Sequence, residues 1–117
     1  MPRNMSFAQT IPQVRNRTKT VTRRVGWKFL QPGTIICAVE KAQGIKKGEL
    51  KRICMIEITK VSFEPLWKIG GEHNGCAKEG FPDMTPFQFV KFFAETFKVD
   101  PSDTITRIEF EYVDDPN

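Results

Sequence analysis

Hydrophobic and polar positions follow a strand-like pattern along much of the chain. Residues 34–40 form an almost continuous apolar run, which is typical of a strand buried on both faces. Residues 50–63 and 104–113 alternate between apolar and polar side chains, as expected of strands with one buried face, and residues 5–9 predict a shorter strand. Because the segment 50–63 is long, we expect it to bend as the wall of a small barrel does.

Two segments carry the start signals of helices. Residues 10–13 and 85–88 both have the Thr-to-Gln spacing of a capping box, with a Pro in the first turn. The first is expected to begin a short helix that ends near residue 17, and the second a helix that continues to residue 97. The second helix has apolar residues three and four apart, which predict a stripe facing the core: Phe89, Val90, Phe93 and Phe97.

The remaining segments predict turns and loops between these elements. Helical turns are expected at residues 25–30 and 65–67, an exposed loop at 43–48, and a polar loop at 70–78. Four or five strands of uneven length, with one early and one late helix, indicate an α+β fold. The simplest arrangement is a small, partly closed β-barrel that forms one domain over residues 1–117.

The cysteines and the apolar runs limit the cellular setting. Cys37, Cys54 and Cys76 form an odd set without paired spacing, so we expect no disulfide framework and a reducing, cytoplasmic compartment. Together with His73 they could in principle hold zinc, but no Cys-x-x-Cys pair is present, and we expect no metal and no cofactor. The N-terminus does not resemble a signal peptide, and the longest apolar run is too short to span a bilayer.

Charge is distributed unevenly along the chain, whose net charge is +4. Residues 1–60 hold thirteen Lys or Arg against three acids, whereas residues 61–117 hold five against eleven. If the halves stay separate in space, the basic half would form one positive face that attracts a polyanion such as RNA. The alternative is a surface on which the two halves mix and form salt bridges.

Basic and hydroxyl side chains are concentrated in residues 17–24. This stretch holds four basic residues and three threonines, and it has little that a core would bury. If it is extended, residues two apart share a face, and a bend at either end would bring Lys19 close to Thr22. An ammonium group beside a hydroxyl, flanked by guanidinium groups, suits a phosphate, a polarised carbonyl or a nucleic-acid backbone. A solvated basic surface is the plainer interpretation.

The segment from Lys19 to Arg24, after a short helix, resembles the signature of the ASCH domain, a relative of the PUA RNA-binding fold. Glu79, followed by Gly80 and placed ahead of a Thr-Pro helix start, is similar to a second landmark of that family, and the order of elements fits nearly the whole chain. The chain departs from the family pattern at Arg17, where a Gly is expected. Arg resists the positive φ that Gly permits, so the family pattern does not predict the conformation of the turn before Lys19.

The resemblance implies a function and a set of residues. Some bacterial ASCH proteins hydrolyse the amide of N4-acylated cytidine with a Lys, a Thr three residues later and a downstream Glu, which correspond here to Lys19, Thr22 and Glu79. A Lys with a lowered pKa could activate the Thr hydroxyl, and the Glu could shuttle a proton or hold the Lys in place. The remaining candidates would bind substrate or nucleic acid: Arg17, Arg23, Arg24, Trp27, His73 and Phe81.

A binding function without chemistry is the competing hypothesis. Other ASCH and PUA-like domains bind RNA, and some are described as ribonucleases, so the expected partner is RNA or a modified nucleoside and not a membrane. An ionised Lys19 paired to Glu79 would be a structural ion pair and a poor general base. The separation of these side chains in the folded chain therefore decides how far the catalytic hypothesis can be taken.

Overall fold

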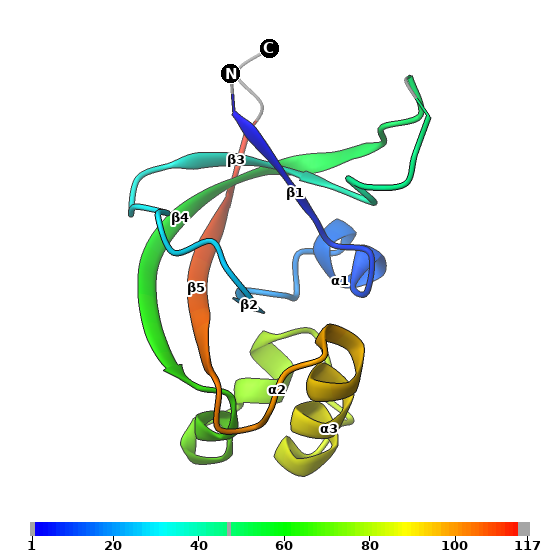
Figure 1. Cartoon of the computed structure of the whole chain (residues 1–117). Coiled ribbons are helices and arrows are strands. Elements are labelled where there is room, and N and C mark those ends of the chain that lie inside the picture. Colours follow the sequence, from blue (N-terminus) through cyan, green and yellow to red (C-terminus); the bar gives the residue numbers. More distant parts are fainter. Residues whose placement is uncertain (1, 47, 115–117) are drawn as a thin grey trace.

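The computed structural model describes residues 2–46 and 48–114, and within them five strands form one curled sheet (Figure 1). The strands follow the order β1-β3-β4-β5-β2 across the sheet. Only the pair of β1 and β3 is parallel. The strands are β1 (Arg3–Ser6), β2 (Val21–Arg24), β3 (Ile35–Val39), β4 (Arg52–Pro65) and β5 (Thr104–Val113).

The sheet curls because its longest strand bends. β4 pairs with β3 over its first part and with β5 along most of its length, and its register against β5 shifts between Ile58 and Lys60. A bulge of this kind increases local twist and bends a strand, and β4 is visibly curved in Figure 1. The two edges of the sheet approach one another, since the guanidinium carbon of Arg24 on β2 lies 4.6 Å from the ring centre of Phe7, just after β1. The expected α+β fold with a partly closed barrel is confirmed.

The helical elements are α1 (Ile11–Arg15), the 3-10 helix η1 (Leu66–Gly71), α2 (Gly75–Lys78) and α3 (Pro86–Phe97). An early and a late helix were both predicted, but the polar loop expected at residues 70–78 is wrong, because η1 and α2 occupy most of it. In Figure 1 α2 and α3 gather at one end of the sheet. No helix among residues 2–46 and 48–114 is long and apolar enough to cross a membrane.

Two hydrophobic clusters correspond to the two parts of the fold. The barrel cluster is built around buried residues from the strands and α1, among them Met5, Ile56 and Ile108. The helical cluster joins η1, α2 and α3 to the start of β5 through residues such as Leu66 and Phe93. The stripe predicted on α3 is only partly buried, since Phe89 and Phe93 are in the core but Phe97 is 43% exposed.

Two local predictions fail where distant parts of the chain intervene. Thr10 is the residue before α1, but its side chain makes no capping hydrogen bond. The Gln13 amide instead donates to the carbonyl oxygen of Gly80 at 3.0 Å, so the expected capping box is wrong. The helical turn expected at residues 25–30 is also wrong, because Gly26 and Trp27 have φ values of +89° and +56°, outside the right-handed helical region.

The second capping box is confirmed and gives a stability prediction. The Thr85 hydroxyl accepts from the Gln88 backbone N–H at 3.1 Å, and the Gln88 side-chain oxygen accepts from the Thr85 N–H at 2.9 Å. We expect Thr85→Ala to lower the free energy of unfolding by about 1 kcal/mol, because it leaves a helical N–H without its acceptor. Urea denaturation measures this change, and an unaltered midpoint would show that the cap does not stabilise α3.

Candidate functional site

A cavity of about 440 Å³ opens between the barrel and the helical end of the molecule, and we call it the pocket. Its polar wall comes from β2 and from the turn after α2. Its apolar wall comes mainly from Trp27, from Phe7 after β1 and from one face of α3. The aromatic and charged residues that line it are Phe7, Lys19, Arg23, Arg24, Trp27, Lys41, Glu79, Phe81, Phe89, Phe92, Phe93 and Phe97, together with Thr22.

Lys19 and Glu79 form a buried ion pair on the polar wall. The Lys19 Nζ donates to the Glu79 carboxylate at 3.0 Å and to the Glu79 backbone oxygen at 2.6 Å, and both side chains are almost fully buried. The next residue, Gly80, has a φ of +100° and lies so close to α1 that an added Cβ would come within 3.0 Å of Gln13. Gly80 therefore allows the turn that places Glu79 beside Lys19.

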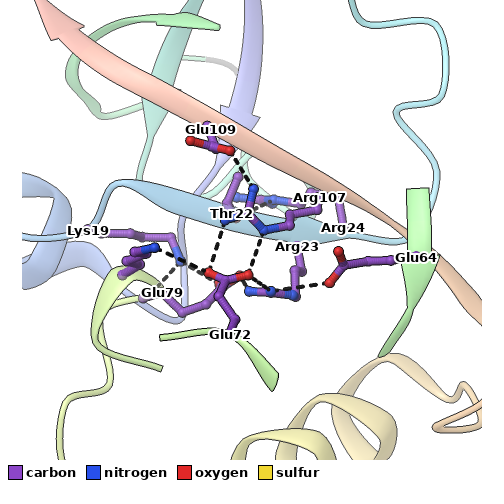
Figure 2. Close-up of polar contacts among 10 residues, drawn as sticks. Lys19, Thr22, Arg23, Arg24, Glu64, Glu72, Glu79, Arg107 and Glu109 are labelled. Carbon is purple, nitrogen blue, oxygen red and sulfur yellow. Dashed lines mark hydrogen bonds and ion pairs between the residues drawn. The ribbon is translucent and has the colours of Figure 1, made fainter. Parts of the chain in front are cut away.

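Arg23 extends this pair into a chain of alternating charges (Figure 2). Its guanidinium group binds Glu79 at 2.9 Å, Glu72 at 2.7 Å and Glu64 at 3.3 Å. Glu72 in turn accepts two hydrogen bonds from Arg107, at 2.8 and 2.9 Å. The acids that neutralise Lys19 and Arg23 come from the second half of the chain. Around these buried bases the two halves mix, so they do not contribute to an uncompensated positive face.

Thr22 and Arg24 lie side by side on β2, as expected for residues two apart on a strand. The Arg24 Nε donates to the Thr22 Oγ1 at 3.0 Å. In the part of the chain that the structure describes, no carboxylate lies within ion-pair distance of Arg24. Burial lowers the pKa of Arg24 to about 10, against the opposing charge of Glu79, so the group remains a cation at neutral pH. The pocket thus holds a positive group, the Arg24 guanidinium, that has no carboxylate partner among the described residues.

Burial also changes the acidity of Lys19. Removal from water lowers the pKa of the Lys19 ammonium below its usual 10.5, and the charges of Arg24 and Arg23 act in the same direction. Glu79 opposes the shift but does not overcome it. The neutral amine, which is the form that can accept a proton, is therefore more accessible at Lys19 than at an exposed lysine.

The structure brings most of the sequence-predicted site residues together. Lys19, Thr22 and Glu79 all line the pocket, as do four of the six expected binding residues: Arg23, Arg24, Trp27 and Phe81. Arg17 and His73 do not line it. Arg17 is exposed and lies 5.5 Å from the ring centre of Tyr112, with a φ of +64°. It thus adopts the backbone conformation for which a Gly was expected. His73 is exposed between η1 and α2.

The aromatic wall was missed by sequence reasoning. Phe89 and Phe93 were assigned to the core alone, and Phe92 was outside the predicted stripe, yet all three line the pocket with Phe97. The available signal was the Phe-Phe pair at residues 92 and 93, which widens the apolar face of α3 beyond a simple stripe. Across residues 2–46 and 48–114, no three His, Cys, Asp or Glu side chains gather in a way that could hold a metal ion.

Glu72 should make the free energy of unfolding depend on pH in the acid range. Burial raises the pKa of Glu72, but the hydrogen bonds from Arg107 and the charge of Arg23 outweigh burial and hold that pKa below 4.5. A carboxylate with a lowered folded pKa contributes stability above its unfolded value and loses that contribution as pH falls through the folded value. We expect the native chain to lose stability below about pH 4.5 and Glu72→Gln to flatten this loss. Urea titrations between pH 3 and 6 would measure the difference, and parallel curves would contradict it.

No family model matches the sequence and no curated protein matches it, whereas solved structures match its fold. An Enterococcus faecalis V583 protein of the DUF984 family aligns over 97% of this chain and 81% of its own, with a TM-score of 0.68 and 19% identity. The hypothetical protein PH0355 aligns over 96% of this chain and 97% of its own, with a TM-score of 0.63 and 15% identity. An ASCH domain from Lactobacillus crispatus JV V101 aligns over 94% of this chain and 78% of its own, with a TM-score of 0.62 and 15% identity.

These likenesses place the chain in a fold class. The curled sheet with helices at one end is the PUA-like fold of ASCH domains, and the resemblance read from residues 19–24 and 79–81 is confirmed at the level of the fold. The identities are too low to carry an activity from one protein to the other. Function must therefore be argued from the pocket itself.

Proposed function

We propose that the pocket binds a nucleoside and hydrolyses the amide of an N4-acylated cytidine. One observation carries the proposal: a buried amine with a lowered pKa, a carboxylate that holds it, and a hydroxyl that accepts from a cation all line one cavity. The volume of about 440 Å³ is in the range of small-molecule sites. Phenylalanine and tryptophan side chains provide the apolar walls that a planar base requires.

Thr22 is the proposed nucleophile and Lys19 its general base. Neutral Lys19 takes the hydroxyl proton while the Thr22 oxygen bonds to the amide carbonyl carbon, and the carbonyl electron pair moves to its oxygen. As the C–N bond breaks, the Lys19 ammonium returns the proton to N4 of the leaving cytidine. Water then hydrolyses the acyl ester on Thr22, with Lys19 again as base, and releases the carboxylic acid.

Arg24 and Glu79 support this chemistry by hydrogen bonding and charge, and neither takes part in a covalent step. The N–H that Arg24 donates to Thr22 occupies the hydroxyl oxygen as acceptor, which leaves the hydroxyl hydrogen free to be transferred and stabilises the developing alkoxide. The remaining guanidinium nitrogens are a source of positive charge for the oxyanion. Glu79 fixes the position of Lys19 through two hydrogen-bond acceptors.

A binding module without catalysis is the second candidate. The observation in its favour is the same ion pair, because a Lys19 that stays protonated beside Glu79 cannot act as a base. In that case the pocket and its cation would hold a nucleotide of an RNA chain without cleaving it. The two candidates differ in turnover and not in binding.

Incubation with N4-acetylcytidine separates them. Chromatography follows cytidine release by the native chain and by Lys19→Ala, and the proposal predicts release by the native chain only. Activity should rise with pH through the lowered pKa of Lys19, because the base works in its neutral form. No turnover at any pH, with RNA retained by the native chain in a filter assay, would reject hydrolysis in favour of the binding module.

A further inference from the structure

Arg3, Trp27 and Phe29 form a stacked group at the rim of the pocket, and we call it the rim platform. Trp27 lines the pocket. The centre of the Phe29 ring lies 5.7 Å from the centre of the Trp27 ring, and the two ring planes are tilted by 31°. The guanidinium carbon of Arg3, on the edge strand β1, lies 4.5 Å from the Phe29 ring centre and 5.4 Å from that of Trp27. The platform is therefore continuous with the aromatic wall of the pocket.

Arg3 and Phe29, the two platform residues outside the pocket wall, are exposed to solvent. Phe29 is 55% exposed, and its neighbours Val25 and Lys28 are also exposed. Slightly more than half of the Phe29 surface is thus accessible to a ligand. Arg3 and Lys28 form no ion pair with any residue in the ranges 2–46 and 48–114. An exposed ring with unpaired cations beside it is complementary to a base and a phosphate.

The backbone that presents the platform is strained. Trp27 has a φ of +56°, and a left-handed conformation is unusual for a bulky residue. It follows Gly26, whose carbonyl oxygen accepts from the Thr106 hydroxyl on β5. This anchor and the following turn, in which the Leu30 N–H donates to the Trp27 carbonyl, fix the segment. In this segment the Trp27 side chain lines the pocket, whereas Phe29 does not.

We propose that the rim platform binds the nucleotide next to the one in the pocket, so that the preferred ligand is a single-stranded oligonucleotide and not a free nucleoside. The inference rests on the proposed function, because it takes the pocket to hold a nucleoside. The neighbouring base stacks on the exposed part of the Phe29 ring, and the Arg3 guanidinium binds the phosphate between the two nucleotides. Sequence readout at this second position is weak, since every base has a face that can stack.

Substitution of Phe29 tests the inference against a matched control. Phe87 is also an exposed phenylalanine, on the first turn of α3, but it does not line the pocket. Fluorescence anisotropy would measure binding of a labelled five-nucleotide RNA with a central cytidine to Phe29→Ala and Phe87→Ala. We expect Phe29→Ala to weaken binding about tenfold, within the range for the loss of one base stack, and Phe87→Ala to bind as the native chain does. Arg3→Gln should reduce the salt slope of log affinity by about one.

Failure of this inference is distinguishable from failure of the proposed function. Equal RNA affinity for Phe29→Ala, Phe87→Ala and the native chain would overturn the platform, whether or not N4-acetylcytidine is hydrolysed. RNA binding that depends on Phe29, without turnover of N4-acetylcytidine, would support the platform and reject hydrolysis. If both hold, Phe29→Ala should lower kcat/KM on the RNA carrying N4-acetylcytidine by a larger factor than it lowers kcat/KM on the free nucleoside.

Discussion

Lys19→Arg is expected to remove most of the turnover of N4-acetylcytidine while the chain stays folded. The substitution keeps a positive charge beside Glu79, so the buried ion pair can persist. It removes the ability to accept a proton, because a guanidinium group stays protonated in proteins. General bases typically contribute about a hundredfold to ten-thousandfold, and we expect kcat/KM to fall by about a thousandfold. Steady-state assays of cytidine release give the size of this loss.

Two further variants show whether the effect belongs to the base. Lys78→Arg is the matched control, since Lys78 is a partly exposed lysine 3.8 Å from the Glu72 carboxylate, and it should keep native activity. Lys19→Met has a shape close to that of lysine and should be as inactive as Lys19→Arg. Native-like turnover by Lys19→Arg would mean that the charge of residue 19 matters and its basicity does not.

Glu79→Gln is expected to give a large loss of stability, about 3 kcal/mol. The amide has nearly the shape of the carboxylate but leaves the Lys19 charge buried without its partner, and breaking a buried pair in this way typically costs about 3–5 kcal/mol. We expect the lower end because Arg23 keeps Glu72 and Glu64. Urea denaturation at pH 7 measures the loss.

The loss should shrink as pH rises. Without Glu79 the folded pKa of Lys19 falls further below its unfolded value of about 10.4, so the unfolded state binds more protons and stability increases with pH across that interval. Glu40→Gln provides the comparison, because Glu40 pairs with Arg15 at the surface and should cost less than about 1 kcal/mol. Equal losses for the two substitutions would contradict the assignment of Glu79 as a buried counter-ion.

Local patterns predicted the elements whose structure depends on local sequence. The alternation in residues 104–113 gave β5 its bounds, and the capping box at Thr85 gave the start of α3. The same capping pattern at Thr10 failed because the Gln13 side chain donates instead to the carbonyl oxygen of Gly80, which lies 67 residues after Gln13. The left-handed turn at Trp27 could not be predicted, because nothing in its neighbours requires a positive φ at a tryptophan.

The sequence indicated most of the polar residues that line the pocket, but not its aromatic wall or its electrostatics. The resemblance to the ASCH pattern named Lys19, Thr22 and Glu79, and all three line one cavity. The charge difference between the two halves indicated a positive face, but the fold pairs Arg23 with Glu79 across 56 residues. Such pairings depend on where β2 and the turn after α2 meet in space. Sequence composition does not contain that information.

Detection of an acyl group on Thr22 tests the central claim most directly. The native chain would be mixed with less than one equivalent of N4-acetylcytidine, quenched in acid and analysed by mass spectrometry, with Thr22→Val as control. We predict an acetyl ester on Thr22 in the native chain, and neither ester nor cytidine release for Thr22→Val. Cytidine release by Thr22→Val at the native rate would contradict the claim that the amine, hydroxyl and carboxylate of this pocket act together.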